Sequence, residues 1–175
     1  LAFKPEVQAH DLVLTTQTKI EPLLQNASLI INTADEPYVG YTNIRLSRYA
    51  LQHNVPMVAA GGFDAHLASL GELLIPHVTP CADCYATFFH ENLKNWKPVT
   101  HPVQERSEWF GGLGSLSAFS AATAVLEVLS YFIHPDTACA ATSGGRGEFL
   151  FHDYSLDTFS VERDIHCPSC GEEEQ

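Results

Sequence analysis

The stretch that decides the fold is SLIINTAD, residues 28–35. Its apolar part predicts a strand, and the chain then turns polar at Asn32 and reaches a carboxylate at Asp35. Apolar residues at helical spacing follow over 40–53, and a second apolar run, Pro56–Ala60, predicts the next strand. Strands that are apolar on both faces and alternate with helices are typical of a parallel sheet. We therefore expect an α/β fold.

The segments around this unit extend the same pattern. Leu12–Thr16 predicts an earlier strand, and Ile20–Asn26 predicts a brief helix. Leu67–Ile75 predicts one further strand that carries Gly71. The expected sheet thus begins with three parallel strands, which antiparallel strands follow.

The second half of the chain is less regular at first. Residues 85–110 are rich in aromatic residues and prolines and lack periodicity, so we expect a mobile crossing loop over 85–112. Long loops of this kind inside compact domains are usually functional. Leu113–Ile133 predicts the longest helix, and 148–153 with 157–162 predict a hairpin. No repeat or linker divides the chain, so residues 1–175 are interpreted as one domain.

Two identical cysteine spacings frame this region, CADC at 81–84 and CPSC at 167–170. Four cysteines in two such pairs are typical of a tetrahedral, structural zinc site, which leaves no open coordination position. The 82 residues between the pairs exceed a zinc ribbon, so the metal would join distant parts of a domain. Two disulfides or iron remain alternatives. The fifth cysteine, Cys139, is interpreted as a small buried residue.

Composition excludes some classes of function. The 175 residues carry 21 acidic and 9 basic side chains, a net charge of −12, which argues against nucleic acid as a partner. No apolar run approaches the length that spans a membrane. Thiolate ligands and an unpaired cysteine favour a reducing, cytoplasmic location.

Two motifs leave their role open. Asp35 follows a strand, where a carboxylate can hold Mg²⁺ on nucleotide phosphates, but it could equally cap the next helix. The glycines of 111–115 resemble a phosphate loop, although no strand precedes them as a dinucleotide-binding fingerprint requires. Close packing at a helix start explains them better.

Several segments together resemble the ThiF/MoeB/HesA superfamily, the bacterial relatives of ubiquitin-activating enzymes. The resemblance is nearest to the branch that matures peptide antibiotics such as microcins. The segments that carry it are residues 30–37, 55–61, Gly71, 80–84 and 166–171.

The resemblance implies a Rossmann-like mixed sheet and a split zinc site made by Cys81, Cys84, Cys167 and Cys170. It also implies that Asp35 holds the Mg²⁺ of ATP and that Asn43 lines the same site. The implied reaction is adenylation of the C-terminal carboxylate of a peptide or small ubiquitin-like carrier protein, and the implied assembly is a homodimer.

Two departures from the family matter. Its glycine-rich nucleotide loop, ribose-binding acid and phosphate-gripping arginine and lysine should precede this sequence, so the chain resembles the second half of an adenylation domain. Residues 85–113 contain no cysteine, which indicates adenylation without thioester transfer. The rival interpretation is a non-catalytic, zinc-stapled module that binds a peptide or acts as a scaffold.

Overall fold

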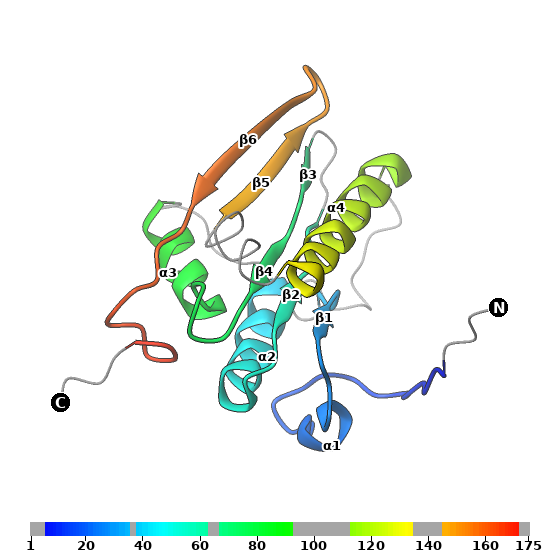
Figure 1. The fold of residues 1–175 in the computed structure, drawn as a ribbon, viewed down its shortest axis with the longest axis vertical. Helices are drawn as coiled ribbons and strands as arrows, with labels where there is room; N and C mark the ends of the chain where they lie inside the picture. Colours follow the sequence, from blue (N-terminus) through cyan, green and yellow to red (C-terminus); the bar gives the residue numbers. More distant parts are fainter. Residues whose placement is uncertain (1–5, 36–37, 63–66, 93–112, 135–144, 172–175) are drawn as a thin grey trace.

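The computed structural model describes residues 6–35, 38–62, 67–92, 113–134 and 145–171 (Figure 1). Its helices are α1 (Glu21–Leu24), α2 (Val39–His53), α3 (Ala82–Asn92) and α4 (Gly114–Ile133). Its strands are β1 (Ile30–Asn32), β2 (Met57–Ala59), β3 (Leu67–Ser69), β4 (Glu72–Leu74), β5 (Gly145–Leu150) and β6 (Ser155–Ser160).

The strands form two small sheets. In the first, with the order β1-β2-β4, β1 and β2 are parallel and β4 is antiparallel to β2. The second sheet, with the order β3-β5-β6, is antiparallel throughout. The fold is therefore mixed α/β, and β1–α2–β2 is the parallel unit that SLIINTAD predicts.

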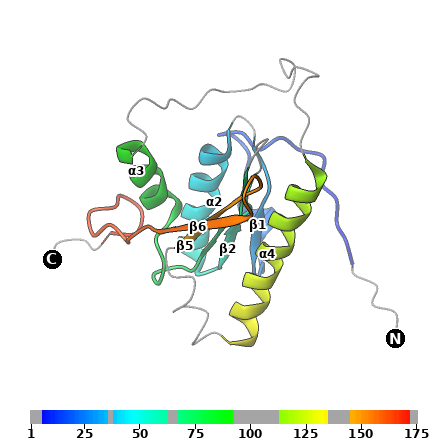
Figure 2. The ribbon, with the colours of Figure 1, turned by 90° about the horizontal axis from the view of Figure 1, so that it is seen from above.

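Helices cover both faces of the first sheet (Figure 2). On one face, Met57, Ala59 and Leu74 pack with α2 and with Tyr85 of α3. On the other face, Val58, Leu73 and Ile75 contact Ala124, Val128 and Tyr131 of α4. Because side chains alternate along a strand, these short strands supply both cores.

Helix α2 confirms the expected helix over 40–53 and its end at Asn54. Asn54 has φ 53°, the left-handed conformation that Asn tolerates, and its backbone N–H donates to the carbonyls of the last turn. The chain then enters β2 directly, which aligns Ile30 with Met57 in the parallel pair.

The prediction of a single strand over Leu67–Ile75 is wrong. The chain forms β3 in the second sheet, bends at Gly71 and forms β4 in the first sheet. Gly71 has φ +85°, and an added Cβ would lie 2.6 Å from the Ala59 carbonyl oxygen. A glycine is required at this bend because another residue would be strained and would clash.

The strand expected at Leu12–Thr16 is also absent from the described residues. Val13 is 73% exposed, and the Thr18 hydroxyl donates to its carbonyl oxygen at 2.7 Å. Such local side-chain bonds turn the backbone away from a sheet ladder. Among the described strands only β1 and β2 are parallel, so the expectation of three is not met.

Two further expectations have mixed outcomes. The irregular segment expected from residue 85 starts as helix α3, which runs to Asn92, and residues 93–112 lie outside the described residues. The hairpin is confirmed as β5 and β6, where Leu150 pairs with Ser155. Tyr154 has φ 59° in the intervening turn.

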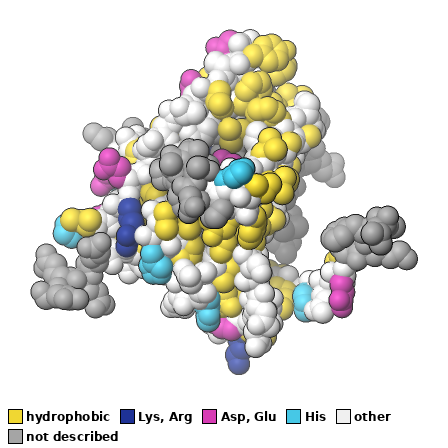
Figure 3. All heavy atoms as spheres, in the orientation of Figure 1, with side chains coloured by type: hydrophobic (Ala, Val, Ile, Leu, Met, Phe, Trp, Pro, Cys, Tyr) yellow, Lys and Arg dark blue, Asp and Glu magenta, His cyan; other side chains and the backbone are white. Residues whose placement is uncertain are grey.

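Helix α4 confirms the longest helix but corrects the statement on membranes. The helix has 20 residues and contains an 18-residue window with a mean hydropathy of 1.6, so by length and composition it could cross a membrane. In this fold one side packs on the first sheet, and its other side exposes apolar residues such as Val125, Leu126 and Leu129. Figure 3 shows hydrophobic side chains gathered over this helix.

Candidate functional site

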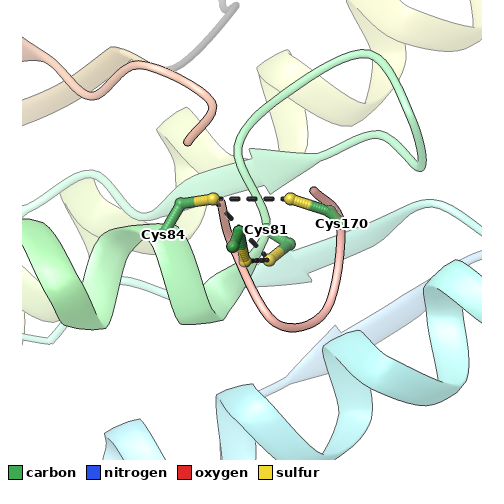
Figure 4. A group of neighbouring side chains, drawn as sticks. Cys81, Cys84 and Cys170 are labelled. Carbon is green, nitrogen blue, oxygen red and sulfur yellow. Dashed lines mark hydrogen bonds between the residues drawn. The ribbon is translucent and has the colours of Figure 1, made fainter. Parts of the chain in front are cut away.

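Four cysteine sulfurs meet between the start of α3 and the segment after β6 (Figure 4). All four Sγ atoms lie within 4.8 Å of one another, and all four residues are buried. The Sγ–Sγ distances are 3.9 Å for Cys81–Cys84, 3.5 Å for Cys81–Cys167 and 3.4 Å for Cys84–Cys170. The structure thus joins the two CxxC pairs that the sequence separates.

These distances fit a tetrahedral metal ion. Zn–S bonds of about 2.3 Å place two sulfurs of a tetrahedron about 3.8 Å apart. A disulfide would need about 2.05 Å, so the four cysteines are free thiols in this structure. The distances fit a metal ion and not a disulfide, and the donor set suits zinc or iron.

The protonation of the thiols also favours a cation. A hydrogen bond between Cys81 and Cys84 raises the pKa of Cys81 and lowers the pKa of Cys84 to about 5. Burial raises the pKa of Cys170 to about 11. The raised pKa values of Cys81 and Cys170 disfavour four thiolates in the metal-free protein. A bound dication would compensate the charge of four thiolates.

Side chains around the cluster hold the two CxxC pairs in place. Asp83, inside the first pair, receives a bidentate contact from Arg48 of α2 at 2.9 and 3.1 Å. The hydroxyl of Ser169, inside the second pair, donates to the same carboxylate. Arg163 donates to the Cys170 carbonyl oxygen and, at 3.3 Å, to that of His77.

We expect Asp83→Asn to weaken metal binding about 10- to 100-fold, because residues that orient ligands have effects of this size. The amide would lose its ion pair with Arg48 and one acceptor for Ser169. A competition titration with a zinc indicator measures the change, and Asp157→Asn, an exposed position on β6, is the matched control. Equal affinities for all three proteins would contradict an orienting role.

A second polar cluster lies where β1 ends. The buried side chain of Asn32 contacts Thr42 and Asn43 of α2, at 3.0 and 2.6 Å. It also accepts the Ala34 backbone N–H at 3.1 Å. Asp35 comes next and is exposed. The structure therefore brings Asn43 to the same end of β1 as Asp35.

Other residues singled out in the sequence fall elsewhere. Gly114 begins α4, whereas Gly111, Gly112 and Cys139 lie outside the described residues. Sequence reasoning missed four polar residues of the two clusters, namely Asn32, Thr42, Asp83 and Ser169. The only sequence signal for them was their position inside or beside a motif, since each is otherwise an ordinary polar residue.

A partly buried ion pair lies at the junction of the two sheets. Arg146 of β5 contacts Glu72 of β4 at 2.5 Å and lies 4.9 Å above the ring of Phe89. Burial raises the pKa of Glu72 despite its partner. Beside it, Phe88, Phe89, Asn92, Glu148 and Phe159 line a hollow of about 270 Å³.

The carboxyl group of Glu127 in α4 gives a prediction on pH. Burial, together with the nearby Glu72 carboxylate, raises the pKa of Glu127 to about 7, and its Oε2 is buried without a hydrogen-bond partner among the described residues. The folded state then binds the proton more tightly than the unfolded state. This contribution stabilises the fold below the ordinary pKa of 4.5 and is lost as pH rises through about 7.

We therefore expect Glu127→Gln to raise the midpoint of thermal unfolding at pH 8 and to leave it nearly unchanged at pH 4.5. Thermal unfolding of both proteins across this range measures the effect, with the exposed Glu162→Gln as control. A difference that is the same at both pH values would show that the carboxyl group does not titrate in this way.

No protein-family model and no curated protein sequence matches the chain. Solved structures do. Escherichia coli MccB matches over 89% of this chain with 16% identity and a TM-score of 0.55. MccB solved with MccA matches over 92% of this chain with 16% identity and a TM-score of 0.59. A heterocyclase solved with substrate and cofactor matches over 84% of this chain with 16% identity and a TM-score of 0.58.

These likenesses establish the fold alone. The chain spans 42% and 45% of the two MccB chains and 21% of the heterocyclase. MccB has also been solved with ATP, and that structure matches with 18% identity and a TM-score of 0.54. One of these neighbours is a heterocyclase, and each of them is at least twice as long as this chain.

Proposed function

We propose that this chain is the C-terminal half of an ATP-dependent adenylating domain of the ThiF/MoeB type. The complete domain would activate the C-terminal carboxylate of a peptide or small carrier protein. A carboxylate oxygen attacks the α-phosphorus of ATP, the bond to the pyrophosphate oxygen breaks, and an acyl-adenylate and pyrophosphate result.

The observation that carries this proposal is the carboxyl end of β1. Ligands of open α/β sheets bind at the carboxyl ends of parallel strands. Here an exposed carboxylate, Asp35, and a half-buried amide, Asn43, stand at that end. The likeness to MccB, which has been solved with ATP and with MccA, supports a nucleotide and a peptide as ligands.

Each residue has a distinct role in this proposal. Asp35 would hold Mg²⁺, which prefers one or two carboxylates together with phosphate oxygens, and Asn43 would donate to a ligand oxygen. The four cysteines would hold a structural zinc ion that joins α3 to the C-terminal segment. Catalysis would then rest on positioning and on electrostatic stabilisation of the phosphate charge.

The upstream half would supply the remaining phosphate contacts. β1 lies at the edge of its sheet, and Ile31 is 59% exposed there. An edge strand can pair with another segment. Helix α4 also exposes apolar side chains, among them Leu126 and Phe132, against which a further segment could pack. A cytoplasmic homodimer, as the resemblance implies, belongs to the same proposal.

The experiment is ATP–pyrophosphate exchange by the complete protein with candidate peptides. Exchange should require a peptide with a C-terminal carboxylate, and the same peptide with a C-terminal amide should give none. Equal exchange with both peptides would contradict activation of that carboxylate.

A second candidate function is a non-catalytic peptide-binding module. The hollow lined by Phe88, Phe89 and Phe159 favours it, because aromatic rings beside the Glu148 carboxylate suit an apolar or cationic side chain. Peptide binding by the complete protein without any ATP–pyrophosphate exchange would favour this module over the adenylating domain.

A further inference from the structure

Two side chains at the end of β1 are more deeply buried than any other part of the candidate nucleotide site. Asn32 is 3% exposed and Thr42 is 0% exposed. An apolar pair of the same shape would stabilise a core about as well, whereas buried polar groups are costly unless every bond is made. The hydrogen bonds of this pair therefore call for a role other than stability.

The direction of the hydrogen bonds is fixed by the backbone. The Ala34 N–H can only donate, so the atom of Asn32 that receives it, at 3.1 Å, is Oδ1. The two hydrogens of Asn32 Nδ2 then point to Thr42 Oγ1, at 3.0 Å, and to Asn43 Oδ1, at 2.6 Å. A flipped Asn32 would place Nδ2 against the Ala34 N–H and lose that bond, so the orientation with Oδ1 toward Ala34 is the one that satisfies the backbone.

Thr42 continues this chain of donors and acceptors. Since its oxygen accepts from Asn32, its single hydrogen goes to the carbonyl of Ala34, at 2.6 Å, or to that of Val39, at 3.0 Å. The shorter of these contacts holds the Ala34 carbonyl, and Asn32 holds the Ala34 N–H. Ala34 immediately precedes Asp35, so the backbone that carries this carboxylate is tied to β1 and α2.

Asn43 lies at the other end of the chain of bonds. Because its Oδ1 accepts from Asn32, the amide is oriented with its Nδ2 hydrogens as the donors that remain for groups beyond the network. A donor suits an anionic oxygen of a phosphate or carboxylate and repels a cation. The acceptor needed for the cation is the Asp35 carboxylate.

We propose that Asn32 and Thr42 are positioning residues for this site. They fix the backbone of Asp35 and orient the Asn43 amide as a hydrogen-bond donor. The site then has a position for a cation at Asp35 and a position for an anionic oxygen at Asn43. A metal–phosphate ligand contains both groups. The proposal rests on the proposed function for the identity of the ligand, but its structural part can be tested without activity.

The decisive variant is Asn32→Asp. It keeps the shape and still accepts the Ala34 N–H, but it cannot donate to Asn43, whose amide then turns to donate inward. In the complete protein we expect KM for Mg·ATP in pyrophosphate exchange to rise about 10- to 100-fold, the effect of one lost hydrogen bond to a charged group. Asn43→Ala should raise it similarly.

A double variant separates positioning from general damage. Because Asn32 acts largely through Asn43, Asn32→Asp should raise KM far less in a protein that already carries Asn43→Ala. Thr42→Ser should restore most of what Thr42→Val loses. Thr123→Val, which removes a matched hydroxyl from α4, should leave the exchange unchanged. Additive effects of Asn32→Asp and Asn43→Ala would overturn the proposal.

A structural readout distinguishes this inference from the proposed function. In nuclear magnetic resonance spectra the Ala34 amide should be protected from hydrogen exchange, and Asn32→Asp should shift the Asn43 side-chain amide signals. An unprotected Ala34 amide, or Asn43 signals unchanged by the variant, would overturn the positioning role. Absence of pyrophosphate exchange in a wild-type protein that passes this test would contradict the proposed function instead.

Discussion

The substitution Cys84→Ser is expected to abolish stoichiometric metal binding and to loosen the C-terminal segment. Structural zinc contributes about 10–16 kcal/mol of apparent binding free energy in small peptides, and the whole stability of a domain is about 5–15 kcal/mol. No helix or strand follows β6 within the described residues up to Gly171. A metal ion bound by the four cysteines, together with the hydrogen bond of Ser169 to Asp83, would hold this segment to α3.

Elemental analysis and hydrogen exchange measure this effect together. The wild-type protein should contain one zinc per chain and show protection over 161–171, and Cys84→Ser should lose both. Cys139→Ser, which changes the cysteine outside both pairs, should keep the metal. A full complement of zinc in Cys84→Ser, or none in freshly prepared wild-type protein, would show that these thiols do not form the site.

The second large effect is expected for Asp35→Asn in the complete protein. ATP–pyrophosphate exchange should fall about a hundredfold or more, because one electrostatic contact to the transition state has about this weight. The fold should be retained, since Asp35 is exposed and lies beyond the last residue of β1. The exposed Asp11→Asn is a control of the same chemistry away from the sheet edge.

Rates measured over a range of Mg²⁺ concentrations refine this test. If Asp35 holds the metal ion, high Mg²⁺ should recover part of the lost rate. A variant that exchanges pyrophosphate as fast as the wild-type protein would assign Asp35 to the other interpretation of the sequence, a helix cap.

The local elements of the fold could be predicted from the sequence, whereas their partners could not. The apolar run of β1, the periodicity of α2 and the hairpin of β5 and β6 each leave a pattern within a few residues. Leu12–Thr16 also carries an apolar pattern, but no described strand pairs with it. At Gly71 the chain bends close to Ala59, and β4 joins a different sheet from β3. This contact joins distant residues, so no local sequence pattern predicts it.

In the candidate sites, too, the residues of a sequence motif could be predicted, whereas the residues that support them could not. Two CxxC pairs have few uses, so Cys81, Cys84, Cys167 and Cys170 predicted a metal centre that the structure confirms as a cluster. The residues that hold these groups act through contacts that join distant segments. Asp83 and Ser169 meet across 86 positions of the chain, so only the fold reveals them.

The measurement that tests the central claim most directly is ATP–pyrophosphate exchange by residues 1–175 alone and together with the upstream half. The isolated chain should show no detectable exchange, because one carboxylate leaves most of the triphosphate charge uncompensated. Among the described residues no helix N-terminus is assigned as a phosphate cradle. Adding the upstream half, in the same chain or as a partner, should restore exchange. Exchange by the isolated chain would contradict the account and would make Gly111–Ser115 the nucleotide loop.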